Sequence, residues 1–272
     1  MTPTALITGA SQGIGQATAL LLASKGYNLI LASRTPETLN QLAQSIQNTG
    51  QKVLPIPTDT RDPQQVQNLL QKALETFPHI DILINNAGIC MTGPIQNTTL
   101  EDWHNIIDTN LWGYIHTIHT LIPHFIQRQQ GTIVNVGSFG GKIPLPYMSA
   151  YCTSKYAITG LTETLRLELA PQNIHICAVH PSATNSDFLQ RAIFRGKDQT
   201  EANQRNQQMR ELLQTPIASK PQDVANAIWE AITHKKSEIV VGSAAPIATA
   251  YQHFPSILQW LMQQTTKTQQ KT

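Results

Sequence analysis

Short apolar segments alternate with amphipathic stretches from the start of the chain, and few folds accept this alternation. Seven segments have the length of strands, and a stretch with helical periodicity follows each of the first six. Strands connected by helices form βαβ units, which build a parallel sheet buried on both faces with right-handed crossovers. We therefore predict an α/β fold with a parallel sheet between helical layers. The expected strands are Ala5–Thr8, Asn28–Ala32, Lys52–Ile56, Ile82–Asn85, Thr132–Val136, His175–Val179 and Glu238–Val241.

With 272 residues the chain can bury one large core, and no linker, repeat or low-complexity block interrupts it before its tail. We expect one main domain over residues 1–246, followed by a helical extension and polar tail over residues 247–272. A formal net charge of +2 argues against a surface dedicated to nucleic acid. No apolar run is long enough to span a membrane, and the N-terminus lacks the pattern of a signal peptide.

The chain has three cysteines, Cys90, Cys152 and Cys177, an odd number without the spacing of a metal site. Free, buried thiols in a reducing compartment are the simplest interpretation. We therefore predict a cytoplasmic protein.

A glycine-rich segment, Thr8-Gly9-Ala10-Ser11-Gln12-Gly13-Ile14-Gly15, connects the first expected strand to the first helix. Gly9 suits a tight turn, and Gly13 and Gly15 would let the backbone and the helix N-terminus approach a pyrophosphate. The spacing differs from the Gly-x-Gly-x-x-Gly of the standard dinucleotide fingerprint. Its position at the first strand–helix turn nevertheless predicts a dinucleotide site.

The end of the second strand indicates which dinucleotide binds. No acidic residue stands there to hold a ribose 2′-hydroxyl, and the sequence offers Ser33 and Arg34 instead. A guanidinium suits a 2′-phosphate. We therefore predict NADP (NADPH) rather than NAD, and the alternative is an arginine that merely faces solvent.

Tyr151 and Lys155 stand four residues apart, and Ser138 precedes the tyrosine by thirteen. On a helix, positions i and i+4 share a face, so the phenol and the ammonium could meet. A cation about 4 Å away is worth on the order of 4 kcal/mol at an effective dielectric of about 20, which would lower the pKa of the tyrosine by roughly three units. Such a tyrosine can exchange a proton with an alcohol or ketone, and Ser138 could polarise the same oxygen.

Several motifs together resemble, in kind and spacing, the single-domain form of the short-chain dehydrogenase/reductase family over roughly residues 3–242. The resemblance implies a Rossmann-like three-layer αβα sandwich, with a seven-stranded parallel sheet and three helices on each face. The main domain would then be a dinucleotide-binding catalytic domain that transfers a hydride between nicotinamide and a carbonyl or secondary alcohol. The motifs are Thr8–Gly15, Asn85-Asn86-Ala87-Gly88, Asn110, Ser138, Tyr151 and Lys155.

The resemblance assigns catalytic roles to four residues. Tyr151 would be the general acid in reduction and the base in oxidation, and Lys155 would lower its pKa and bind the nicotinamide ribose. Ser138 would hydrogen-bond the substrate oxygen. Asn110 would hold a water in a proton relay that reaches Lys155.

Contacts to the cofactor follow from the same resemblance. Asp59 would accept a hydrogen bond from the adenine amino group, with Thr60 beside it. Further contacts to ribose and phosphates are expected from Asn86, Gly88, Ser11 and the amide of Ile14.

The segment after the sixth strand departs from the family pattern of Pro-Gly with a threonine four residues later. Pro181 is followed here by Ser182, a change that affects the local turn. Ser186 stands in the place of the threonine and keeps a hydroxyl for the cofactor. Thr184 should present its backbone to the nicotinamide carboxamide.

The segment Asn185–Pro216 is rich in Gln, Arg and Asn, and we expect it to form a helical substrate-loop insertion over about residues 186–216. It should lie at the edge of the sheet where ligands bind in open α/β folds. Apolar residues in the irregular segments favour a hydrophobic ketone, or an acyl or steroid-like chain, over a sugar. They are Phe139, Leu145, Pro146, Tyr147, Met148, Phe188 and Phe194.

The apolar stretch Ile247–Met262 lies beyond the core of the family. It could cap the substrate pocket, pack on a neighbouring subunit or lie on a membrane surface. It contains no Lys or Arg, which weakens the membrane alternative, so docking on the protein is expected. The tail Thr265–Thr272 is polar and is expected to fray.

His116, His119 and His124 share one expected helix. The pair at i and i+3 could ligate a metal, but no acidic residue falls on that face, so we expect no metal site. The resemblance also indicates a homodimer or homotetramer through the helices Asn110–Gln127 and Ser149–Ala170.

An NADP-dependent oxidoreductase is the leading prediction, and two alternatives stay open. An epimerase-type reaction would keep the tyrosine–lysine pair, but such proteins usually carry a separate substrate domain. A non-catalytic NADP-binding sensor would not need the proton relay. The substrate and the physiological direction are not readable from the sequence.

Overall fold

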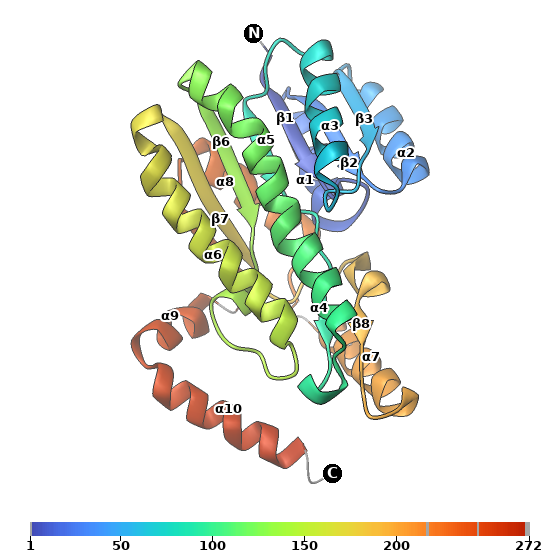
Figure 1. The fold of residues 1–272 in the computed structure, drawn as a ribbon, viewed down its shortest axis with the longest axis vertical. Coiled ribbons are helices and arrows are strands. Elements are labelled where there is room, and N and C mark those ends of the chain that lie inside the picture. The colour runs from blue at the N-terminus through green and yellow to red at the C-terminus, as the bar shows by residue number, and fades with distance from the viewer. Residues whose placement is uncertain (1, 216–217, 244, 270–272) are drawn as a thin grey trace.

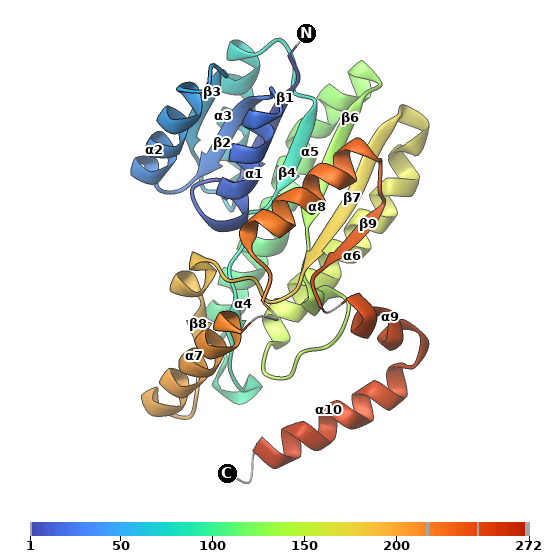
Figure 2. The same cartoon turned by 180° about the vertical axis from the view of Figure 1, so that it is seen from behind.

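The computed structural model describes residues 2–215, 218–243 and 245–269. Pro216, the last residue of the predicted insertion, and residues 270–272 of the predicted tail lie outside them. A seven-stranded parallel sheet lies between two layers of helices (Figures 1 and 2). The predicted α/β, Rossmann-like three-layer architecture is therefore confirmed.

All seven predicted strands are present, each within two residues of its expected ends, and every pairing in the sheet is parallel. The order of strands reverses between β1 and β4, a place where open α/β sheets bind ligands. Across the sheet the strands are β3 (Val53–Pro57), β2 (Asn28–Ser33), β1 (Thr4–Thr8), β4 (Ile82–Asn85), β6 (Gly131–Val136), β7 (Ile174–Pro181) and β9 (Glu238–Val241).

Each face of the sheet packs against its own set of three helices, as predicted. Side chains alternate between the faces along a strand, so Ile7 and its neighbour Leu6 contribute to different hydrophobic cores. One core packs against α1 (Gly13–Ser24), α2 (Pro36–Gln47) and α8 (Pro221–Thr233). The other packs against α3 (Pro63–Thr76), α5 (Gly113–Arg128) and α6 (Ser149–Leu169).

The helix α4 (Leu100–Ile107) continues into α5 through a π-helical segment, η2 (Asp108–Trp112). Thr99 and Asp102 form a capping box at the start of α4. A π-helical turn inside an α-helix often marks a functional site, and this one carries Asn110. The remaining short helices of the core are η1 (Ile95–Asn97), η3 (Phe139–Gly141) and η4 (Ala170–Gln172).

The predicted insertion is largely helical and also carries a strand that the sequence did not indicate. It contains η5 (Asp187–Arg191), β8 (Ile193–Phe194) and α7 (Gln199–Gln214). The strand β8 pairs in parallel with β5 (Met91–Thr92), and the Arg195 guanidinium donates to both carboxylate oxygens of the buried Asp102, at 2.9 and 2.7 Å. The base of the insertion is therefore tied to the main body.

The C-terminal segment forms α9 (Ala245–His253) and α10 (Pro255–Gln269). The helix α10, red in Figures 1 and 2, lies apart from the sheet, and Phe254, Ile257 and Trp260 are about 60% exposed. The predicted docking is therefore wrong for α10 within one chain. The helix α10 runs on through residues 265–269, the first part of the tail that was predicted to fray. No helix among the described residues is long and apolar enough to cross a membrane.

Candidate active site

A cavity of about 560 Å³ opens at the carboxyl ends of the strands. Its walls come from the segments that follow β1, β2, β3, β4, β6 and β7, together with the insertion and α9. Ser11, Gly15 and Asn110 do not line it. All the other predicted site residues do: Gly9, Gly13, Ile14, Ser33, Arg34, Asp59, Thr60, Asn86, Gly88, Ser138, Tyr151, Lys155, Pro181, Thr184 and Ser186.

The glycine turn is held by contacts within the protein. Gly9 has a φ of +63°, and a Cβ on Gly15 would lie 2.2 Å from the carbonyl oxygen of Gly9. The side-chain amide of Asn86 donates to the carbonyl oxygens of Thr8 and Gly9, at 3.0 and 3.1 Å. Gly15 is therefore required for packing of the turn, and the amide of Asn86 braces that turn at the wall of the cavity.

Polar groups around the turn have capacity for a ligand. The helix α1 begins at Gly13, and the side chain of its N-cap residue, Gln12, makes no capping hydrogen bond to the amides of the first turn. The hydroxyl oxygens of Ser11 and Ser33 are buried and have no hydrogen-bond partner among the described residues. A buried hydroxyl without a partner is costly, and a dinucleotide running from the turn to the end of β2 would supply partners.

The predicted adenine end of the site is positively charged. Arg34 is exposed at the wall of the cavity. Asp59 is bound by Arg61 through Nε and Nη2, at 3.0 and 2.6 Å. Burial opposes ionisation of Asp59, but hydrogen bonds from Arg61 and the charges of Arg61 and Arg34 lower its pKa overall. The carboxylate proposed for adenine is thus already engaged, whereas Arg34 is the exposed cation beside it.

The helix α6 presents Tyr151 and Lys155 to the cavity from one face, as their spacing predicts. Both side chains are buried. Lys155 Nζ donates to the carbonyl oxygen of Val136 at 3.0 Å and lies 5.9 Å from the ring centroid of Tyr151. Ser138, at the end of β6, lines the same wall, and its hydroxyl oxygen accepts from the amide of Gly140 at 3.1 Å.

The expected lowering of the tyrosine pKa by the lysine is wrong for this geometry. Burial, and then the neighbouring Cys90, raise the pKa of Tyr151, although a hydrogen bond with Ser138 acts in the opposite direction. Burial also lowers the pKa of Lys155 to about 8, because the ammonium is held away from water. Tyr151 is therefore protonated at neutral pH, which is the form that a general acid needs.

Asn110 lies in η2 and is fully buried. Its Oδ1 accepts from the amide of Ile89 at 2.8 Å, and its Nδ2 donates to the carbonyl of Ile89 at 2.9 Å and to Ser154 Oγ at 3.1 Å. The side chain therefore fixes the chain around Ile89 behind the cavity wall. A relay water would have to be held mainly by the backbone of η2.

We expect Asn110→Ala to lower the free energy of unfolding by about 2–4 kcal/mol, because it removes two partly buried hydrogen bonds to the backbone of Ile89 and a buried one to Ser154. Urea denaturation followed by circular dichroism would measure the change. Asn68→Ala, at an exposed position of α3, is the matched control and should change stability by less than about 0.5 kcal/mol. A loss at Asn110 no larger than that of the control would contradict the structural role.

Residues 3–195 match the family model described as short chain dehydrogenase. The chain belongs to the short-chain dehydrogenase family. It is 30% identical over 262 residues to the uncharacterised oxidoreductase YxnA of Bacillus subtilis (strain 168), a match that covers 95% of this chain and 70% of YxnA.

Two solved members of the family carry a bound cofactor. A short-chain dehydrogenase/reductase from Burkholderia phymatum, in complex with NAD, superposes with a TM-score of 0.86 at 27% identity and covers 95% of each chain. A short-chain dehydrogenase from Sphingobium yanoikuyae, in complex with NADPH, gives 0.76 at 29% identity and covers 96% of this chain and 95% of its own. The fold therefore accommodates either nicotinamide dinucleotide.

The short-chain dehydrogenase departs from its family pattern after β7 without losing the local turn. The amide of Ser182 donates to the carbonyl of Val241 at 3.1 Å, and its hydroxyl lies 3.2 Å from that of Ser219. Thr184 and Ser219 form a parallel bridge, in which the amide of Asn185 donates to Ser219 and the amide of Ser219 donates to Ala183. The amide of Thr184 itself takes no part in these two hydrogen bonds. Ser186 lies beside Gly13, where a Cβ would approach it to 3.4 Å, so its hydroxyl stands next to the glycine turn.

The far side of the cavity is apolar, but its lining differs from the predicted one. Tyr147 and Phe194 do not line it; the ring of Tyr147 packs instead under the Arg205 guanidinium, 4.4 Å from the ring centroid. The predicted residues that do line it are Phe139, Leu145, Pro146, Met148 and Phe188. Five further lining residues belong to segments that the sequence placed near the pocket without singling these residues out: Arg191, Met209, Leu212, Leu213 and Ile247.

These further lining residues leave a weak sequence signal. Met209, Leu212 and Leu213 are apolar positions at helical spacing in an otherwise polar helix, a pattern that indicates one apolar face. Ile247 shows that the C-terminal extension contributes to the cavity wall through α9. Arg191 Nη2 donates to Gln12 Oε1 at 2.9 Å, which brings a cation of the insertion to the glycine turn.

Two of the three histidines of α5 have structural contacts. His116 Nδ1 lies 2.9 Å from the carbonyl oxygen of Thr60, and His124 Nε2 accepts from the amide of Ile80 at 3.2 Å. Among the described residues no group of three or more His, Cys, Asp or Glu side chains is placed to hold a metal ion.

Proposed function

We propose that this short-chain dehydrogenase is an NADP-dependent oxidoreductase that interconverts a hydrophobic ketone, or an acyl-type carbonyl, and the secondary alcohol. The main support is that Ser138, Tyr151 and Lys155 line one cavity whose far side is apolar. A bound nicotinamide dinucleotide supplies or accepts the hydride in such a reaction. The residues of the chain bind, orient and exchange the proton.

In the direction of reduction, the buried and protonated Tyr151 donates its phenolic proton to the substrate oxygen. Ser138 donates a hydrogen bond to the same oxygen and so favours the charge that develops there. Lys155, mostly charged at neutral pH, holds the ribose hydroxyls of the cofactor and carries positive charge close to the phenol. Oxidation reverses each of these transfers.

The choice of NADP is supported by Arg34 and Ser33 at the end of β2. Arg34 is exposed at the cavity, and Ser33 has a buried hydroxyl oxygen without a hydrogen-bond partner among the described residues. A guanidinium and a hydroxyl suit a 2′-phosphate. An acidic side chain, which would select NAD, is absent from this turn of the sequence.

A panel of carbonyl substrates tests the proposal. The purified protein is mixed with NADPH and either aliphatic or aromatic ketones of increasing size, a β-ketoacyl thioester or a keto sugar, and oxidation of NADPH is followed by absorbance. We expect turnover of the apolar ketones or the thioester, and little with the sugar. Tight NADPH binding without oxidation by any member of the panel would favour the sensor alternative instead.

The pH dependence of the reductase follows from the pKa of Lys155, which burial lowers to about 8. As the pH rises through this value the ammonium loses its proton, so kcat/KM in reduction should fall, by about tenfold per pH unit once the decline is established. Tyr151 stays protonated over this range because its pKa is raised. A rate that stays level up to the ordinary lysine pKa of about 10.4 would contradict this assignment.

The setting of the enzyme is part of the proposal. Cys90, Cys152 and Cys177 are free and buried, which supports a reducing, cytoplasmic compartment. Exposed apolar side chains on α5 and α6, among them Tyr156 and Leu167, support a homodimer or homotetramer. We assign catalysis to residues 1–246 and keep residues 247–272 as an extension that adds Ile247 to the substrate wall.

A further inference from the structure

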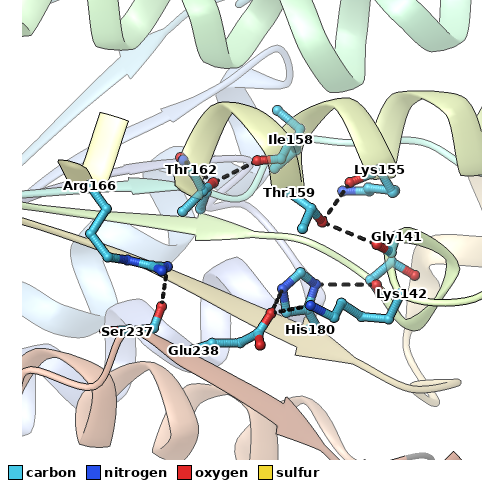
Figure 3. A network of polar contacts seen from close by, with 12 residues as sticks. Gly141, Lys142, Lys155, Ile158, Thr159, Thr162, Arg166, His180, Ser237 and Glu238 are labelled. Carbon is cyan, nitrogen blue, oxygen red and sulfur yellow. Dashed lines mark hydrogen bonds and ion pairs between the residues drawn. The ribbon is translucent and has the colours of Figure 1, made fainter. Parts of the chain in front are cut away.

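His180, Lys142 and the partly exposed Glu238 form a polar cluster that has no role in the chemistry described so far (Figure 3). His180, at the end of β7, is fully buried. Its Nε2 lies 2.9 Å from Glu238 Oε1, and its Nδ1 lies 3.3 Å from the backbone carbonyl oxygen of Ser138. Lys142 Nζ donates to the same Glu238 oxygen at 2.7 Å.

The donors and acceptors of the cluster are fixed by its geometry. Nδ1 of His180 faces a carbonyl oxygen and Nε2 faces a carboxylate oxygen, and both oxygens only accept, so each ring nitrogen must carry a hydrogen to bond to its partner. Hydrogen bonds from His180, and then from Lys142, lower the pKa of Glu238 to about 2, against the opposing effect of burial. Glu238 is therefore an ionised anchor on the edge strand β9, to which both other side chains are tied.

The segment that carries the catalytic serine is held near both of its ends. Near its start the carbonyl of Ser138 contacts His180, and at its end Lys142 bonds to Glu238. The imidazole also packs directly on the preceding residue, because a Cβ on Gly137 would lie 2.4 Å from Nδ1. The position of Ser138 thus depends on β7 and β9 as well as on its own strand.

We propose that His180, oriented by Glu238, is a positioning residue that sets the place of the Ser138 hydroxyl in the active site. This inference rests on the proposed reductase function. His180 itself touches no reacting atom. It acts through the backbone of Ser138, and it makes the polarising hydroxyl sensitive to a residue on a strand at the edge of the sheet.

The structure provides a control for a purely structural effect. Arg166, on α6, joins β7 to the residue before β9: it donates to the carbonyl of Ile176 at 3.1 Å and to that of Ser237 at 2.7 Å, the second of which Figure 3 shows. Arg166→Met should therefore weaken the attachment of β9 without moving the serine. Variants at Arg166 and at His180 should therefore both lose stability, but only those at His180 should change kcat.

The test compares two replacements of His180. His180→Asn keeps an amide donor near the place of Nδ1, whereas His180→Phe keeps the ring shape and removes the donor. We expect His180→Phe to lower kcat, calculated per NADPH-binding site, by about tenfold, with an unchanged Kd for NADPH. The kcat of His180→Asn should stay within about threefold of the wild-type value. Arg166→Met should leave kcat unchanged.

A second measurement does not depend on turnover. Hydrogen–deuterium exchange of the peptide over residues 137–142 should rise in His180→Phe relative to His180→Asn and Arg166→Met. Equal kcat and equal exchange in His180→Phe and wild type would overturn the positioning role. If the wild type reduces no carbonyl, the proposed function fails, and the exchange experiment still decides whether His180 holds the segment.

Discussion

The variant Tyr151→Phe should turn over carbonyl substrates about 10²–10⁴ times more slowly than the wild-type chain, because it lacks the only proton that the phenol could donate. The replacement keeps the buried ring, so folding and NADPH binding should be preserved. Steady-state rates with the best ketone of the panel, together with NADPH fluorescence titration, separate the two effects. Retention of a tenth of the wild-type rate would remove Tyr151 from the catalytic role.

Tyr114→Phe is the matched control for this experiment. Tyr114 is also buried, its hydroxyl donates to the carbonyl of Val136 at 3.0 Å, and its ring lies 5.5 Å from Lys155 Nζ. Removing this hydroxyl should cost about 1 kcal/mol of stability and leave the rate within a few-fold. A similar loss of rate in both variants would point to disturbance of Lys155 rather than to a lost proton donor.

The second large effect is expected from Arg34→Asp, which should change the ratio of kcat/KM for NADPH to that for NADH by about 10²-fold or more in favour of NADH. The variant removes the guanidinium proposed to pair with the 2′-phosphate and adds a carboxylate that would repel this phosphate and could accept from a 2′-hydroxyl. The measurement is steady-state kinetics with both cofactors at a fixed ketone concentration. An unchanged ratio would show that Arg34 does not read the 2′ position.

Arg34→Lys distinguishes charge from geometry in the same assay. A lysine keeps the positive charge but not the planar fork, so the preference for NADPH should weaken without reversing. A full reversal by lysine would mean that the bidentate geometry, and not the charge, selects the cofactor. Arg61 should not take over the role, because Asp59 already holds its guanidinium.

The sheet was predictable because its strands are short apolar runs between helical patterns. A short apolar run is enough to indicate a strand that is buried on both faces. The pair β5 and β8 was not predictable, since two-residue strands carry no period and lie far apart in the sequence. The position of α10 was missed for a different reason. Its apolar residues indicate that the helix packs against another apolar surface, but they do not indicate which molecule provides that surface.

The gathering of Ser138, Tyr151 and Lys155 at one cavity was predictable from the sequence, but the environment of these residues was not. The spacing of Tyr151 and Lys155 put both on one face of a helix, yet burial reverses the expected direction of the tyrosine pKa. Burial of a given side chain depends on every element that packs around it, so a local sequence motif cannot predict that burial. His180 shows the same limit, because its contacts to Ser138 and Glu238 join three different strands or strand ends.

The way the glycine turn is braced bears on how relatives of this chain should be interpreted. Gly9, Gly15 and Asn86 are held by contacts with the backbone of the turn, so a descendant that had lost its cofactor would still need them in order to fold. Selection would relax first at Ser33 and Arg34, whose side chains make no hydrogen bond to the turn among the residues that the structure describes. The glycine pattern alone therefore indicates membership of the family, whereas changes in sequence at the end of β2 would indicate that cofactor binding has been lost.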